Sequence, residues 1–470
     1  MDSLSLVDYS IVVIYFLAVI LIGLVVKKKI KGLGDYFVAG RRLTLPLFVA
    51  TLVSTWYGGI LGVGELSFNY GYVNWLTQGA FWYLSYLFFA LYLARKVRMS
   101  KLYTIPDLLE KFYDKKVRFL GAIFNFLMVT PAPYVLSLGI VFSLFFGWPI
   151  WLGIVLGTVL VIFYTVRGGF YADVNTDLLQ FLLMTIGAAL VIPFAISRFG
   201  GLEFLHANLP ETHFTLTGTW TLQMIIVWGF LACWTLVDPG FYQRCYAAKD
   251  PSTARKGILI SILFWGMFDI CTTFTGMYAR AAMPDIDPTT AYAVFPLEVL
   301  PVVLKGVFLA GVLATIMSTV DSFTFLGAMN LAQDLYKGVF RPQASEKQVM
   351  RLTKWGILVT AGLAMLIALY FQSLVAIWYT IGTVGISALL VPVLAGFFGK
   401  GNKSSLAAFL SMLTGFTLSL AWLIHGNLNA VDGWPVYLWG LEPLYPGLAL
   451  SFLVFIVVNF LKKDPCKTTC

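Results

Sequence analysis

Long apolar runs separated by short polar segments recur along the whole chain of 470 residues. A helix that crosses about 30 Å of hydrocarbon needs roughly 20 mostly apolar residues, and about thirteen runs reach this length. The pattern therefore predicts an all-α polytopic membrane protein. The predicted spans are 7–26, 45–70, 73–94, 118–145, 149–166, 178–197, 220–241, 257–280, 304–334, 354–371, 374–397, 404–424 and 441–461.

The second and seventh predicted spans contain residues that interrupt a helix. The second has four glycines between residues 58 and 64, and the seventh has Gly229 followed by Asp238-Pro239-Gly240. Any single glycine in a membrane helix also has a simpler explanation, since glycine allows close helix packing. The glycine cluster, with a counterpart five spans later, favours two broken helices that line a cavity.

An offset of five spans places the two breaks in helices of opposite direction, as in an inverted-topology repeat. Broken helices in such folds meet near the middle of the bilayer and free backbone groups for a solute and a cation. The sequence predicts one integral domain over 1–470, with a five-plus-five core. Its expected parts are an N-terminal helix and loop (1–44), two repeats (45–200 and 215–400), and two C-terminal helices with a tail (401–470).

Composition and charge agree with a membrane protein. Hydrophobic residues make up 59% of the chain and charged residues 12%. If the N-terminus is outside, every one of the 32 Lys and Arg residues except Arg198, Arg280 and Lys305 falls in an inner loop or the C-terminal tail. Basic residues in short loops stay cytoplasmic, so we expect a multi-pass protein of the plasma or inner membrane, N-terminus outside and C-terminus inside, surrounded by lipid. The net charge of +9 then reflects topology and argues against a nucleic-acid partner.

The ninth predicted span carries a row of oxygen-bearing side chains. Ser318, Thr319 and Ser322 offer hydroxyls and Asp321 a carboxylate, and residues three apart share one helical face. A hydroxyl in a helix commonly bonds back to its own backbone, which remains the alternative for each residue alone. A carboxylate inside a membrane is expensive and marks a functional site. Together with carbonyls freed by the second span, this row predicts a sodium site.

A second polar cluster follows Gly168-Gly169 and includes Thr176 and Asp177. Thr or Asp at a helix start satisfies free backbone N–H groups, so Asp177 is explained equally well as a cap or as a carboxylate on an ion path.

At this point the chain resembles the sodium:solute symporter family. The matching motifs run in family order: Gly40-Arg41-Arg42, Tyr103-Thr-Ile-Pro-Asp-Leu-Leu-Glu110, Gly168-Gly169 with Thr176-Asp177 and Gln180, Gln243-Arg244 with Ala247-Ala-Lys249 and Ala254-Arg255, Ala314 to Thr319, and Gln333-Asp-Leu-Tyr336. Each motif is weak alone, but their joint order is specific. The resemblance implies a LeuT-type fold with extra helices at either end.

The resemblance also implies ion ligands. One sodium would be held by the hydroxyls of Ser318 and Thr319, the carbonyl of Thr315, and the broken-helix carbonyls of Ser54 and Tyr57. A second ion site or exit path, as in some members, would use Asp177, Asp321 and Ser322. Asp321 departs from the family's usual hydroxyl, so it either strengthens that site by its charge or carries a proton.

The substrate site is less defined. The polar residues that hold sugar in sugar-transporting relatives are replaced here, so sugar recognition is not supported. The expected cavity residues are Trp56, Gly58, Gly59, Leu61, Trp234 and Asp238, which suit a small, partly apolar solute with an amine facing Asp238. A helix cap is the alternative for Asp238, packing is the alternative for Trp56, and the buried acids Glu65 and Asp269 have no assigned partner.

The function predicted from the sequence is sodium-coupled import of a small organic solute by alternating access. A proton-coupled symporter of the same fold is the main alternative, because Asp177 and Asp321 could relay protons; a membrane sensor is a weaker one. The chain has no GxxxxGK[ST] loop, which argues against direct ATP coupling. Its three histidines fall in predicted outer loops, so a membrane-embedded enzyme with a histidine-bound metal is not expected. The sequence specifies no oligomeric state, and a monomer is compatible with it.

Overall fold

The computed structural model describes residues 4–26, 30–371, 373–399, 403–431 and 435–461. In these ranges the chain forms helices and connecting turns, with one isolated bridge between Leu43 and Ala248 in place of any sheet. The predicted all-α class is therefore confirmed. The basic residues 27–29 and the tail after 461, both used in the topology prediction, lie outside the described residues.

The first half of the chain forms a series of helices that ends in a kinked helix of 50 residues. Its elements are α1 (Leu6–Val26), α2 (Leu33–Val38), α3 (Leu45–Trp56), α4 (Ile60–Tyr70), α5 (Tyr72–Asn74), α6 (Phe81–Phe88), α7 (Ala94–Ser100), α8 (Ile105–Phe112), α9 (Lys115–Met128), α10 (Ala132–Phe146) and α11 (Ile150–Phe199).

The second half begins with a short helix and ends in a helical pair. Its elements are α12 (Leu202–Asn208), α13 (Leu222–Leu231), α14 (Pro239–Ala247), α15 (Pro251–Ala282), α16 (Ala291–Val299), α17 (Leu304–Met329), α18 (Glu346–Tyr370), α19 (Leu374–Phe398), α20 (Ser405–Leu428) and α21 (Leu444–Leu461).

Ten helices of the described residues are long and apolar enough to cross a membrane, or eleven if one bent pair counts as a single span. The predicted count of about thirteen also includes 149–166, a shorter apolar helix, and 73–94, which consists of consecutive short helical and π-helical segments. Predicted spans 149–166 and 178–197 both fall in α11, which is kinked at Gly169, where φ is 54°.

The bent pair is α3 and α4, and it is the first predicted broken helix. The two helices meet at 59° across Tyr57, Gly58 and Gly59. The break occurs at the start of the glycine cluster, while Gly62 and Gly64 lie inside α4. The predicted interruption of the second span is confirmed.

The seventh predicted span is also interrupted, after Gly229 and not at it. Helix α13 ends at Leu231, residues 232–237 form a 3₁₀ turn, and α14 starts at Pro239. Asp238 is extended and its Oδ1 accepts a hydrogen bond from the Phe241 N–H at 2.9 Å. Proline fits the first turn of α14 because its missing N–H has no partner there.

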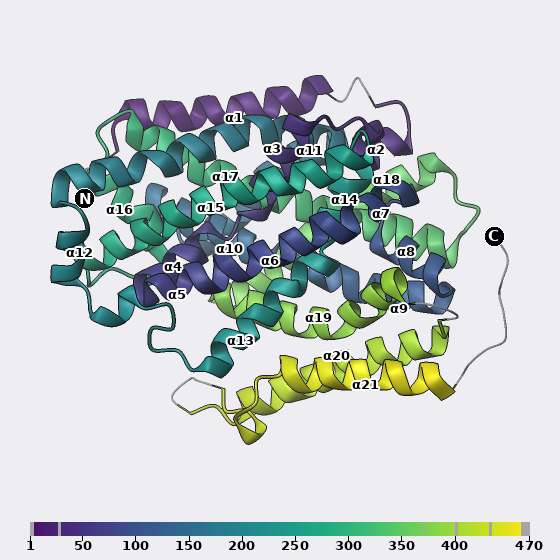
Figure 1. Ribbon diagram of the computed structural model, residues 1–470. Helices are drawn as coiled ribbons and strands as arrows, with labels where there is room; N and C mark the ends of the chain where they lie inside the picture. The colour runs from purple at the N-terminus through teal and green to yellow at the C-terminus, as the bar shows by residue number, and fades with distance from the viewer. Residues whose placement is uncertain (1–3, 27–29, 372, 400–402, 432–434, 462–470) are drawn as a thin grey trace.

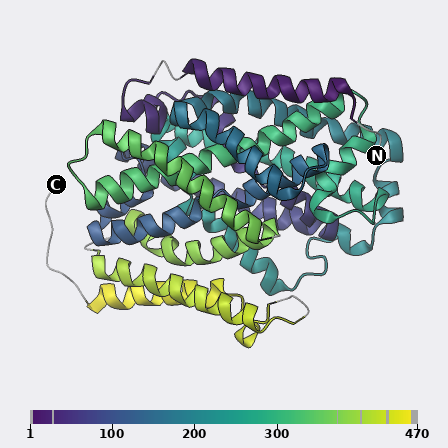
Figure 2. The same cartoon turned by 180° about the vertical axis from the view of Figure 1, so that it is seen from behind.

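Helix α17 lies at the centre of the molecule, with 94% of its most apolar window buried. It packs along α11, and both contact α3. In Figure 1 the helices run in roughly the same direction, with α1 along one side and the α20–α21 pair along the opposite side. Figure 2 shows the same arrangement from behind. Both broken helices therefore border the interior of the bundle.

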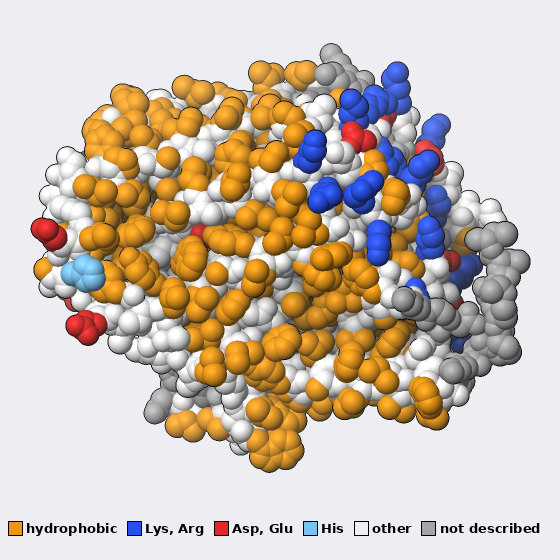
Figure 3. Space-filling view, in the orientation of Figure 1, with side chains coloured by type: hydrophobic (Ala, Val, Ile, Leu, Met, Phe, Trp, Pro, Cys, Tyr) orange, Lys and Arg blue, Asp and Glu red, His pale blue; other side chains and the backbone are white. Residues whose placement is uncertain are grey.

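The surface is divided by residue type. Figure 3 shows hydrophobic side chains over most of one face and Lys and Arg side chains gathered at one end of it. Apolar side chains on the outer helices, such as Leu263 and Leu366, are mostly exposed. An apolar belt with charges at its end is what a lipid-embedded bundle requires.

Candidate functional site

The hydroxyl row of α17 faces the first broken helix. Thr319 Oγ1 donates to the Thr55 carbonyl at 2.8 Å and to the Thr315 carbonyl of its own helix at 3.2 Å. Ser318 Oγ donates to Asp177 Oδ1 at 2.6 Å. These side chains are fully buried, so a cluster of oxygen atoms lies in the protein interior beside the break.

The broken-helix carbonyl that meets α17 is one residue from the expected position. The sequence analysis expected Ser54 and Tyr57, but Thr55 supplies the carbonyl that Thr319 contacts. Ser54 Oγ bonds back to the Ala50 carbonyl at 2.8 Å. A Cβ added to Gly58 would lie 2.0 Å from Thr319 Oγ1, so the close approach of the break to α17 requires glycine there.

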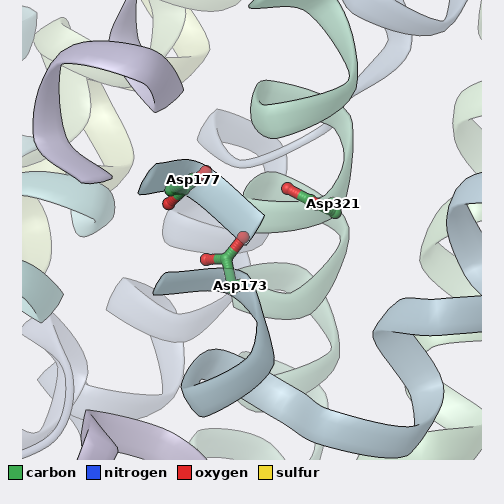
Figure 4. A group of neighbouring side chains, drawn as sticks. All are labelled: Asp173, Asp177 and Asp321. Atoms are coloured by element: carbon green, nitrogen blue, oxygen red, sulfur yellow. The ribbon is translucent and has the colours of Figure 1, made fainter. Parts of the chain in front are cut away.

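Three carboxylates lie next to this row. Asp173 and Asp177 come from successive turns of α11 and Asp321 comes from α17 (Figure 4). One oxygen from each lies within 4.8 Å of the others, and all three side chains are buried. Among the described residues they form the one acidic group whose spacing suits a metal ion.

Arg244 of α14 provides a positive charge in this cluster. Its Nη2 lies 3.3 Å from Asp173 Oδ2 and 3.9 Å from Asp177 Oδ2. The same nitrogen donates to Thr55 Oγ1 and to Ser322 Oγ, each at 2.7 Å. The guanidinium thus connects α14 to α3, α11 and α17, which are the elements that carry the expected ion ligands.

The cluster contains more acidic groups than basic ones. Besides Arg244, the carboxylates accept from hydroxyls: Ser322 donates to Asp173 at 2.7 Å, Tyr164 donates to Asp321 at 2.8 Å, and Ser318 and Thr51 donate to Asp177. The backbone N–H of Ser322 also donates to Asp321 Oδ1 at 2.7 Å. Asp173 and Asp321 also form a side-chain hydrogen bond with each other. Buried carboxylates need compensation by cations or protons, so three acidic groups beside one guanidinium suit a further positive charge.

Asp177 does not cap a helix. It lies within the second part of α11, and the described hydrogen bonds to its carboxylate come from Ser318 and Thr51. Of the two explanations left open by the sequence, the cap is therefore not the one observed.

A cavity of about 790 Å³, counting its open side, lies beside the broken helices. Ten of the fifteen lining residues are aromatic, and six of these are tryptophan. The lining residues are Trp56, Tyr57, Gly59, Val63, Gln78, Trp82, Tyr86, Tyr134, Trp228, Leu231, Trp234, Trp265, Asp269, Phe323 and Trp378.

The structure brings together only part of the expected substrate set. Trp56, Gly59 and Trp234 line the cavity. Leu61 is fully buried in α4 and Asp238 caps α14, so neither is among the lining residues. The carboxylate in the cavity is that of Asp269, for which the sequence analysis had no partner.

Several residues of both sites were not singled out from the sequence. Asp173 had a usable signal, because it lies four residues before Asp177 and so on the same helical face. Arg244 belongs to a motif that was quoted without a role. The aromatic lining comes from helices far apart in the chain, and no local pattern connects Trp82, Trp265 and Trp378.

A helical membrane bundle with two broken helices, an internal oxygen cluster and an adjacent cavity defines a transporter of small solutes. Comparisons with known proteins give its family. The family model described as "Sodium:solute symporter family" matches residues 36–415, so the chain belongs to the sodium:solute symporter family. It is a transport protein and not an enzyme.

Relatives extend over most of the chain. The "Osmoregulated proline transporter OpuE" of Bacillus subtilis (strain 168) is 27% identical, covering 97% of this chain and 95% of its own. The "High-affinity choline transporter 1" of Drosophila melanogaster is 26% identical, covering 78% of this chain and 63% of its own. The "Sodium/pantothenate symporter" of Haemophilus influenzae is 27% identical over 63% of this chain and 61% of its own.

A solved structure shares the whole fold. A Na+-coupled sialic acid symporter, solved in a substrate-bound outward-open state, matches with a TM-score of 0.83 at 17% identity, over 99% of this chain and 100% of that one. The expected LeuT-type, all-helical fold is therefore confirmed.

Proposed function

We propose that this protein imports a small organic solute together with sodium by alternating access. The observation that carries the proposal is the contact of Thr319 with the Thr55 carbonyl, beside the buried hydroxyl of Ser318. It places two hydroxyls of α17 against the break of the first broken helix. Hydroxyl and carbonyl oxygens are ligands that a hard cation prefers.

The first sodium ion would bind between α17 and the α3–α4 break. Its protein ligands are the hydroxyls of Ser318 and Thr319, the Thr315 carbonyl and carbonyls of the break. The contact at Thr55 favours the carbonyl of Thr55 over that of the neighbouring Ser54. The two hydroxyls also bond to the Asp177 carboxylate and the Thr55 carbonyl, which lie beside this position.

A second cation position lies at Asp177, Asp321 and Ser322, as expected from the sequence, with Asp173 added. The excess of buried carboxylates over the guanidinium of Arg244 supports it. Whether this position takes sodium or protons decides between sodium coupling alone and a contribution from protons.

Transport requires that the ion and the solute favour one state of the two-repeat core over the other. The repeats would be 45–200 and 215–400, with the N-terminus outside and the C-terminus in the cytoplasm. Sodium between α3 and α17 would hold the break in the form that binds solute. Loss of sodium to the cytoplasm would then release the solute.

Sodium-dependent thermal stability of the purified protein tests the first site without knowledge of the solute. Binding to the folded state stabilises it by an amount that grows with the logarithm of sodium over Kd. Ser318→Ala and Thr319→Ala each remove one ligand, so we expect about a tenfold or larger rise in the sodium concentration that gives half of the stabilisation. Thr324→Ala is the matched control, since it removes a buried hydroxyl of α17 that has no partner among the described residues.

An unchanged sodium midpoint in both Ser318→Ala and Thr319→Ala contradicts the assigned site. Stabilisation by acidic buffer in potassium, with no effect of sodium, contradicts sodium coupling and favours the proton-coupled alternative.

A further inference from the structure

The cavity beside the broken helices has the chemistry of a site for a methylated ammonium group. We propose that the solute carried by this protein is a small molecule with a fully alkylated ammonium head and an acceptor oxygen, such as the quaternary ammonium alcohols and betaines. This inference rests on the proposed function, because it assigns the substrate class of the same transporter.

The walls of the cavity suit a cation without N–H groups. Six tryptophans line it, and the face of an indole ring attracts a cation more strongly than that of any other side chain. The rings are held in place by each other: Trp56 packs edge-on against Trp82 and Phe241 at 5.7 and 5.0 Å between centroids, and Tyr86 lies 4.2 Å from Trp265. Side chains that are already packed in place lose little conformational entropy when a ligand binds between them.

The cavity contains one acidic side chain, which forms no ion pair among the described residues. Asp269 of α15 is the charged residue among the described lining residues. Its Oδ1 accepts from Tyr57 Oη at 2.8 Å and its Oδ2 accepts from Tyr83 Oη. The described ion pairs do not include it. A buried carboxylate held only by neutral phenols is an uncompensated charge, and a cationic solute would supply its counter-ion.

The hydrogen bonds already made by Asp269 distinguish between kinds of ammonium group. Both of its oxygens are engaged by tyrosines, and the surrounding walls are mostly rings, with few acceptors for further N–H donors. A primary ammonium would leave several N–H groups unpaired in a buried site, at a cost. A trimethylammonium group has no N–H to satisfy and fills apolar space while it keeps its charge.

The cavity also offers donors that lack acceptors. Trp265 Nε1 and Gln78 Nε2 belong to residues that line it and have no partner among the described residues. Trp265 is 1% exposed, so water does not readily serve its N–H. Unpaired buried donors favour a ligand that accepts hydrogen bonds, which a carboxylate or hydroxyl at the other end of the solute would do.

Binding to the purified wild-type protein tests the charge requirement directly, with thermal stability and tryptophan fluorescence as readouts. The probes are choline and glycine betaine, each compared with its uncharged-head carbon isostere, 3,3-dimethylbutanol and 3,3-dimethylbutyrate, and with ethanolamine and glycine, which lack the methyl groups. We expect at least one methylated probe to bind about tenfold or more tightly than its isostere and than its unmethylated counterpart. Comparison of glycine betaine, which has a carboxylate, with choline, which has a hydroxyl, shows which acceptor group the site prefers.

Substitutions at two positions connect the preference to the cavity. Asp269→Asn keeps the shape of the side chain and should abolish the preference for charge over isostere. Trp378→Phe should retain more binding than Trp378→Leu, because it keeps a ring. Trp355→Leu is the control: Trp355 is 62% exposed on α18 and should leave binding unchanged.

The outcomes separate this inference from the proposed function. Each titration is run in sodium and in potassium. The inference is overturned if sodium stabilises the protein but the methylated ammonium probes are not preferred. This includes the cases in which neither probe binds and in which proline binds better. Sodium coupling would remain intact in each of these cases. Binding of those probes that is equal in sodium and potassium supports the inference and contradicts the coupling.

Discussion

At the scale of single residues, Arg244 is the side chain that makes the buried cluster sustainable. It is fully buried, pairs with Asp173 and donates to hydroxyls of α3 and α17. Removing one member of a buried ion pair leaves the other charge uncompensated, which costs about 3–5 kcal/mol. The loss of stability on removing Arg244 depends on the charge of Asp173, so substituting both residues together reveals their interaction.

We predict that Arg244→Met strongly lowers the melting temperature and that adding Asp173→Asn recovers part of the loss. Residues in direct contact deviate from additivity, whereas Arg341→Met, on an exposed turn, should have little effect and should not respond to Asp173→Asn. The measurement is thermal unfolding of the purified variants in sodium. Strict additivity of the Arg244 and Asp173 effects would contradict the assigned pairing.

The sequence predicted the individual residues of the two sites less well than it predicted the helices and the fold. Ser318, Thr319 and Asp177 could be chosen from hydroxyl and carboxylate positions within apolar runs. The sequence could not show that Thr55, and not Ser54, presents its carbonyl to α17, because this depends on how α3 is rotated against α17. The carboxylate of the cavity was expected at Asp238, but that side chain caps α14. Asp269 lines the cavity instead, from α15, a predicted span for which the sequence indicated no site.

At the scale of elements, the break between α3 and α4 depends on glycine for its approach to α17. A Cβ at Gly58 would lie 2.0 Å from Thr319 Oγ1, and one at Gly59 would lie 1.8 Å from the Trp378 ring. Both distances are far below van der Waals contact, so a side chain at either position would displace the broken helix from α17 or from the Trp378 ring. The glycine cluster therefore predicted the break for a reason that the structure makes explicit.

We predict that Gly58→Ala weakens the sodium stabilisation by displacing the break from α17, and that Gly59→Ala weakens binding of the solute by displacing Trp378. Gly229→Ala is the matched control, because its Cβ would meet Phe81 at an ordinary 3.6 Å. Sodium and ligand titrations of the three variants measure this. Equal behaviour of all three would show that the break tolerates a side chain and would contradict the account.

At the scale of the whole molecule, the hydrophobic pattern was enough for the fold class, and the ordered motifs were enough for the family. The count of about thirteen spans remains a prediction, because residues 72–100 form short consecutive helical segments and two predicted spans share the kinked α11. The orientation remains a prediction from the distribution of basic residues.

Labelling with a membrane-impermeant maleimide tests the orientation in a background whose native cysteines are replaced by serine. We predict that Glu211→Cys, in the loop after α12, reacts in intact cells, and that Lys347→Cys, near the start of α18, reacts only after permeabilisation. Both positions are exposed, so access and not burial decides the result. Labelling of Lys347→Cys in intact cells would reverse the proposed topology.

The central claim is that the α17 hydroxyls and the α3–α4 break bind sodium, and retention of radioactive ²²Na+ by the purified protein tests it most directly. The account predicts retention that unlabelled sodium displaces and potassium does not, reduced about tenfold or more in apparent affinity by Ser318→Ala and Thr319→Ala and unaffected by Thr324→Ala. No displaceable ²²Na+ in the wild type, or equal retention in the Ser318 and Thr319 variants, would contradict it.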